Sequence, residues 1–326
     1  MAGDSAAIRA EPGPVWQQVA GVLAANPDAT QAPAHLRSKA MTDSEQQNLQ
    51  RLAALLATTD QLARRIRDTD IAQYEPGPGS PLAGDDREAG IFTLSAAAWN
   101  HLVVAADHLD TLRVATVGCA EHGEVTMHLH LFAQFTLLRS VIENAAVTLW
   151  LLSPAARDDR VLRRLRHATA DIRNNESLRE LIRQPGRKTR AQRLDQVRDA
   201  ATSRGLDPKL ALQPLRLEQV VREAGDTTEI GADNLLGQWR ACSALAHGDL
   251  WASIAIPGQT RQPSARPGMA DLHLSPNVAG LCDWLTDATT LADAALDLYE
   301  QRRQPPMLTL PGARPAAVPA GATPVP

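Results

Sequence analysis

Residues 42–73, TDSEQQNLQRLAALLATTDQLARRIRDTDIAQ, decide the fold class. Leucine and isoleucine recur in this stretch every three or four residues, which is the spacing of one buried helix face. Thr42 and Glu45 form a capping box, in which each side chain accepts a hydrogen bond from the other residue's backbone N–H. The stretch therefore predicts one long amphipathic helix that begins near Thr42.

The same spacing of apolar residues recurs along most of the chain and predicts a series of further helices. They are expected over residues 95–117, 125–152, 155–184, 188–204, 216–224, 232–247 and 276–302. The only β-structure expected is a short hairpin within 251–275, with strands near 251–256 and 271–274. Residues 74–90 hold four glycines and three prolines and are expected to form a loop. The expected fold class is all-α, a bundle of long helices.

The two ends of the chain differ from this bundle in composition. Residues 1–40 are rich in Ala, Pro and Gly, and residues 304–326 contain seven prolines. Such segments cannot bury enough apolar surface to fold, so we expect both to be disordered. Between them we expect a single helical-bundle domain over residues 41–303.

Composition and charge exclude several classes of protein. The chain has 326 residues, of which 44% are hydrophobic, which is enough for a substantial core. Its net charge of −4 excludes a wholly basic nucleic-acid binder but leaves a local basic patch open. The three cysteines, Cys119, Cys242 and Cys282, form no Cys-x-x-Cys motif. Reduced thiols and a cytoplasmic location are therefore expected.

The most apolar part of the chain, residues 125–152, carries Arg139 and Glu143 near its middle. Charges are costly inside a bilayer, so we expect a buried helix and no membrane contact. The two side chains are four residues apart and face the same side of a helix. One interpretation is a mutual ion pair that stabilises the bundle. The other is a polar binding pocket in the bundle core.

A basic segment follows this helix. Residues 155–204 contain 14 Arg or Lys and 7 Asp or Glu, a net charge of +7. Arg157, Arg160 and Arg164 share a helix face and are candidates for binding phosphate groups, with RNA as a candidate ligand. The segment has no aromatic residue on which a base could stack. A solvated helix face with internal ion pairs is the alternative.

The sequence lacks the motifs of several common classes of enzyme. The sequence contains no phosphate-binding glycine loop, no His-Glu-x-x-His and no Gly-x-Ser-x-Gly. Five of the nine histidines lie between His101 and His130, but the Glu-x-x-His motif of di-iron bundles is absent. We therefore expect no metal site and no cofactor, and a metal-binding bundle is the alternative.

The segment 239–249, WRACSALAHGD, is the best candidate for a catalytic site. Arg240 and His247 are seven residues apart, so they point the same way from a helix. Gly248 is expected to end that helix, and Asp249 to hold the imidazole of His247 by a hydrogen bond. An arginine for phosphate charge and a histidine for proton transfer are the groups that metal-independent RNA cleavage needs.

Together with LLRSVIENAAVTLWLL at 137–152, this segment resembles the HEPN superfamily, over about residues 93–302. The resemblance implies a homodimer of toxin or defence type that cleaves RNA without metal. It places Arg240 and His247 at the scissile phosphate. Many catalytic members have a polar residue directly after the arginine, where this chain has Ala241.

The alternative function is a non-catalytic helical module. It would bind a protein partner or a small ligand at Arg139 and Glu143. The spacing Arg-x6-His also occurs at Arg160/His167 and Arg266/His273. The first of these pairs lies on a highly charged helix that is expected to face solvent. The second lies in a Pro- and Gly-rich stretch.

Overall fold

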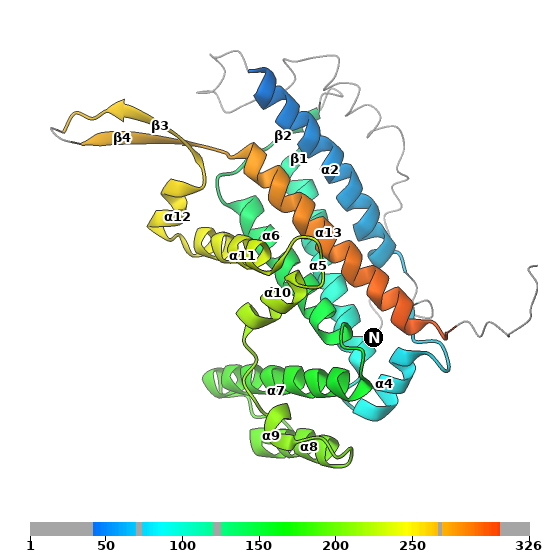
Figure 1. Ribbon diagram of the computed structural model, residues 1–326. Helices are drawn as coiled ribbons and strands as arrows, with labels where there is room; N and C mark the ends of the chain where they lie inside the picture. The colour runs from blue at the N-terminus through cyan, green and yellow to red at the C-terminus, as the bar shows by residue number, and fades with distance from the viewer. Residues whose placement is uncertain (1–41, 70–73, 120–124, 267–268, 307–326) are drawn as a thin grey trace, which may run out of the picture.

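The computed structural model describes residues 42–69, 74–119, 125–266 and 269–306. Its core is a bundle of four long helices: α2 (Asp43–Arg67), α5 (Leu94–Thr116), α6 (Ala133–Leu152) and α13 (Val278–Arg303). In Figure 1, α13 runs beside α2, and both contact α5, which packs along α6. The expected all-α bundle is confirmed.

Besides the short helix α12 (Leu250–Ala255), six shorter or peripheral helices of the described residues surround this bundle. They are α4 (Pro81–Ala89), α7 (Arg157–Ile182), α8 (Arg190–Thr202), α9 (Pro208–Ala211), α10 (Leu217–Gly225) and α11 (Ala232–His247). Helices α10 and α11 pack on α6 and extend the main core. Helices α7, α8 and α9 lie at one end of the molecule and form a second, smaller apolar cluster with the last residue of α4 (Figure 1).

The expected capping box is present at the start of α2. Thr42 Oγ1 accepts from the Glu45 amide at 3.2 Å, and Glu45 Oε2 accepts from the Thr42 amide at 2.8 Å. The expectation of a loop over 74–90 is wrong, because residues 81–89 form α4. Ser80 caps this helix by accepting from the Ala83 amide, and Pro81 occupies its first turn. Proline suits that position because the first helical N–H groups lack partners in any case.

The expected hairpin is present, but its first strand begins later than predicted. Strands β3 (Gly258–Pro263) and β4 (Ala270–Ser275) pair antiparallel, with Gly258 opposite Ser275. Most of residues 251–256, expected to form the first strand, instead belong to helix α12 (Leu250–Ala255), which buries Ala252. In Figure 1 the hairpin extends away from the bundle, and almost all of its described side chains are half-buried or exposed.

A second antiparallel ribbon was not predicted. Strands β1 (Val117–Cys119) and β2 (Val125–Met127) pair between α5 and α6, with Val117 opposite Met127. As a result α6 begins at Ala133, later than the predicted helix start at residue 125. Strands of three residues are too short to show a period of two, so the sequence offers no signal for them.

The apolar helix α6 is buried between its neighbours. Among the described residues, it is the one continuous helix whose length and composition would allow it to cross a membrane. Two thirds of its most apolar window, 67%, lies buried inside the structure, against α5, α13, α10 and α11. This packing accounts for its composition. The terminal segments expected to be disordered, residues 1–40 and all but the first residues of 304–326, lie outside the described residues.

Candidate functional site

The C-terminal half of α11 presents Arg240 and His247 to solvent. The Arg240 side chain is 58% exposed, and its Nη2 forms an ion pair with Glu218 Oε1 of α10 at 3.0 Å. His247 is the last residue of the helix and is also exposed. Because seven residues are close to two helical turns, the two side chains leave the same face, as the spacing predicts.

Gly248 ends α11 in the left-handed conformation, with φ 73°. This turn lets the Asp249 amide donate to the Ala244 carbonyl at 2.9 Å, which closes the helix end. Asp249 is the N-cap residue of the next helix, α12 (Leu250–Ala255). The expected hydrogen bond between Asp249 and His247 is absent, although both residues are described. Gly248 separates the two residues at the helix end, and both side chains are exposed without a hydrogen bond between them.

Two large apolar side chains lie directly after this site, and sequence reasoning missed them. Leu250 is 73% and Trp251 58% exposed, both in the first turn of α12. Large apolar side chains left exposed side by side are typical of surfaces that bind something. The signal that could have located them is the pair Leu-Trp immediately after the Gly-Asp that follows α11.

The Arg139–Glu143 pair forms as the i, i+4 spacing predicts. Arg139 Nη2 lies 3.3 Å from Glu143 Oε2, and Trp239 Nε1 donates to the same oxygen at 3.2 Å. The Arg139 guanidinium also lies over the Trp239 ring, 5.6 Å from its centroid. The pair therefore connects α6 to α11 while both charged side chains remain partly open to solvent.

The three arginines expected on one phosphate-binding face do not form such a face. Arg160 is only 3% exposed, and its Nε and Nη2 bind the two oxygens of buried Asp85 at 2.6 and 2.8 Å. Its Nη1 donates to the carbonyls of residues 154 and 155. Arg157 contacts the same carboxylate at 3.1 Å but stays half exposed. The expectation is wrong for Arg160 because α7 packs against α4, which supplies its counter-charge.

The third of these arginines, Arg164, belongs to a polar centre at the junction of α5, α6 and α7. His101 Nε2 and His167 Nε2 are 3.0 Å apart, so one ring donates to the other. Asn144 Oδ1 lies 2.7 Å from His101 Nδ1, and Arg164 Nη1 lies 3.4 Å from His167 Nδ1. His167, expected to face solvent, is buried. His101 and His167 are 66 positions apart in the sequence, so no local sequence pattern could predict their contact.

Burial governs the protonation of this histidine pair. It lowers the pKa of His101, and it lowers the pKa of His167 to about 3, with further lowering from His101 and Arg164. Both rings are therefore neutral near neutral pH. Because a protonated imidazole has two donors and no acceptor, the Nε2–Nε2 hydrogen bond requires at least one neutral ring.

The histidine pair predicts a loss of stability in mild acid. Unfolded His167 takes up a proton as the pH falls below 6.5, whereas the folded residue does so only near pH 3. Stability is thus complete above pH 6.5 and declines below it, by about 2 kcal/mol near pH 5. Urea unfolding at a series of pH values measures this slope. The variant His167→Gln should flatten it and the exposed control His273→Gln should not; an unchanged slope in His167→Gln would contradict the assignment.

Within the described ranges, no group of three or more His, Cys, Asp or Glu side chains is arranged to hold a metal ion. The candidate residues thus differ in their surroundings. Arg240 and His247 are both exposed, Arg139 and Glu143 form an ion pair, and His167, which contacts His101, is buried. No protein-family model matches the chain, and no curated protein or solved structure is significantly similar to it.

Proposed function

We propose that this chain is a metal-independent ribonuclease of the HEPN type, with a toxin or defence role, that acts as a cytoplasmic homodimer. The observation that carries the proposal is the joint exposure of Arg240 and His247 on one face of α11. An imidazole exchanges protons near neutral pH, and a guanidinium stabilises the charge of a phosphate. Those are the two tasks of RNA cleavage without a metal.

The surroundings of the two residues support this assignment. Exposed ion pairs such as Arg240–Glu218 contribute little to stability, so an RNA phosphate can replace Glu218 as the partner of Arg240. Trp251 offers an aromatic face on which a base can stack, which residues 155–204 lack. Leu250 adds exposed apolar surface of the kind that is buried between protomers.

We assign Asp249 to the same site. It follows His247 by two residues and is also exposed. Catalytic hydrogen bonds are often long in a free enzyme and shorten when substrate binds. In the complex, the Asp249 carboxylate would stabilise the protonated imidazole of His247.

Replacing Arg240 by Gln tests the role of this charge. Loss of a charged hydrogen bond to the phosphate is expected to lower the rate of RNA cleavage by about 10- to 100-fold. Arg222→Gln is a matched control, because Arg222 forms the other exposed ion pair between α10 and α11, with Asp233 at 2.6 Å. Equal rates for the two variants would contradict the assignment of Arg240.

A second candidate function is a non-catalytic module that binds a protein partner or small ligand at Arg139 and Glu143. The specific observation in its favour is that this partly open ion pair lies beside the ring of Trp239. Arginine and tryptophan are among the residues that dominate binding energies at protein interfaces. Absence of RNA cleavage by the folded wild-type chain would favour this candidate.

A further inference from the structure

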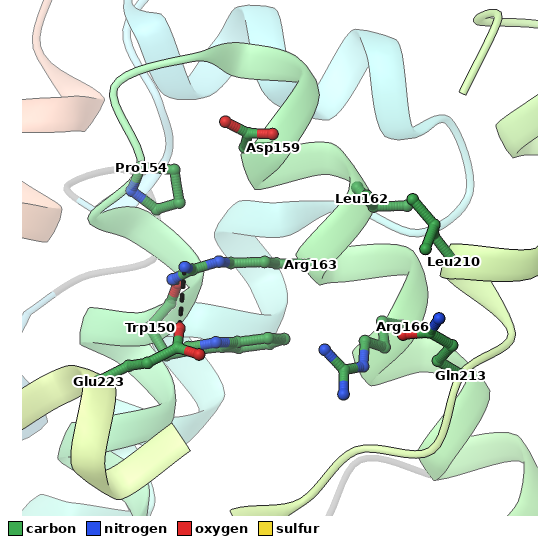
Figure 2. A pocket seen from close by; sticks show the side chains of 9 residues that line it. All are labelled: Trp150, Pro154, Asp159, Leu162, Arg163, Arg166, Leu210, Gln213 and Glu223. Carbon is green, nitrogen blue, oxygen red and sulfur yellow. Dashed lines mark hydrogen bonds and ion pairs between the residues drawn. The ribbon is translucent and has the colours of Figure 1, made fainter. Parts of the chain in front are cut away.

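An open cavity of about 380 Å³ is lined by the end of α6, the first half of α7, and residues of α9, α10 and the segment that joins them. Its volume lies in the range typical of sites for small molecules. Figure 2 shows the nine side chains that line it, with Arg163 and Arg166 extending from α7 and the ring of Trp150 lying against Arg163. Neither the proposed ribonuclease nor the Arg139–Glu143 pair uses this cavity.

Arg163 is a fixed part of the wall. Its Nη1 donates to the Trp150 carbonyl at 2.6 Å, and its Nη2 donates to Glu223 Oε2 at 2.9 Å. Its guanidinium stacks over the Trp150 ring, 5.0 Å from the centroid. These contacts fix the position of the side chain. Because Arg163 and Glu223 balance each other's charge, Arg163 attracts an anionic ligand only weakly.

Arg166 differs from Arg163 because no carboxylate of the described residues balances its charge. Its Nε and Nη2 both donate to the Pro214 carbonyl, at 3.3 and 2.7 Å, which orients the guanidinium. Its Nη1 has no partner in the part of the chain that the structure describes, and neither has the side-chain amide of Gln213 beside it. A positioned arginine donor and an amide therefore face one end of the cavity.

The rest of the lining limits what can bind to these donors. Leu162 and Leu210 form an apolar wall next to Arg166 and Gln213 (Figure 2). Asp159 also lines the cavity, and its carboxylate repels a second negative charge on a ligand. The lining thus favours a ligand with one negative charge and an apolar body, and disfavours a phosphate dianion.

We propose that this cavity binds a small organic monocarboxylate, whose carboxylate accepts hydrogen bonds from Arg166 Nη1 and Gln213 and whose apolar body packs on Leu162 and Leu210. A carboxylate matches a guanidinium donor in both charge and geometry. The site is separate from the ribonuclease site, so its test does not depend on RNA cleavage.

Titration of the full chain with benzoate and hexanoate, at constant ionic strength, tests the proposal. Inorganic phosphate and benzyl alcohol serve as probes that lack the apolar body and the charge, respectively. Both carboxylates are expected to bind, with phosphate and benzyl alcohol weaker by about tenfold or more. Phosphate binding as tight as benzoate binding, or no binding of either carboxylate to the folded protein, would overturn the proposal.

Variants locate the binding at this cavity. Arg166→Gln is expected to weaken benzoate binding by about 10- to 100-fold. Arg173→Gln is the matched control, because Arg173 donates to the Leu212 carbonyl at 2.8 Å from the same helix but does not line the cavity. Leu210→Asp, at a half-exposed position, places a negative charge on the apolar wall and should abolish binding. Unchanged benzoate affinity in Arg166→Gln or in Leu210→Asp would overturn the assignment.

Discussion

Replacing Asp85 by Ala is expected to lower the free energy of unfolding by about 3–5 kcal/mol, the largest loss of stability that we expect from removing any single charged side chain. Asp85 is fully buried and binds Arg160 through both carboxylate oxygens, at 2.6 and 2.8 Å. Without it, the Arg160 guanidinium keeps its charge inside the protein and loses its counter-charge. Urea unfolding of wild type and variant measures the difference.

Two comparisons separate this buried pair from ion pairs in general. Asp233→Ala removes an exposed pair of the same 2.6 Å length, with Arg222, and should cost less than about 1 kcal/mol. The double variant Asp85→Leu with Arg160→Met removes both charges and should recover most of the loss, because no unpaired charge stays buried. If Asp85→Ala cost no more than Asp233→Ala, Arg160 would have to be solvated, and the packing of α4 on α7 would be wrong.

Replacing His247 by Ala is expected to lower the rate of RNA cleavage by about 10²–10⁴-fold, the usual contribution of a general acid or base. His247 is the exposed last residue of α11, so its removal should leave the free energy of unfolding almost unchanged. A fall in rate with intact stability therefore reports on chemistry and not on folding. Single-turnover rates with saturating protein give the cleavage step directly.

A matched control comes from the other exposed Arg-x6-His pair. His273 lies on strand β4 and is exposed, so His273→Ala removes a surface imidazole of the same motif without touching α11. Its cleavage rate should equal that of the wild type. Equal losses in His247→Ala and His273→Ala would mean that the effect comes from surface charge, and the assignment of His247 would fail.

The long helices could be predicted because each of them buries a continuous apolar stripe. Helix α2 shows this most clearly, with the Thr42–Glu45 capping box at its start and leucines at helical spacing behind it. The end of α11 at Gly248 could also be predicted, since glycine adopts the left-handed conformation without strain. The seven-residue spacing of Arg240 and His247 also predicts that both side chains leave the same face of α11.

The missed elements have physical reasons in common. Helix α4 lies in a stretch rich in Gly and Pro. This composition favoured a loop and obscured the helix start signal of Ser80 followed by Pro81. Asp85 and Arg160 are 75 residues apart, so their pairing depends on a packing of α4 against α7 that no local pattern encodes. Arg160 and His167 look solvent-exposed in sequence for the same reason: the groups that pair with them come from other helices.

The most direct test of the proposed ribonuclease is cleavage of a defined RNA by the purified wild-type chain in the presence of excess EDTA. We expect cleavage to proceed at the same rate with and without EDTA, because Arg240 and His247 need no metal. Absence of cleavage by the folded protein, or cleavage that EDTA abolishes, would contradict the proposal.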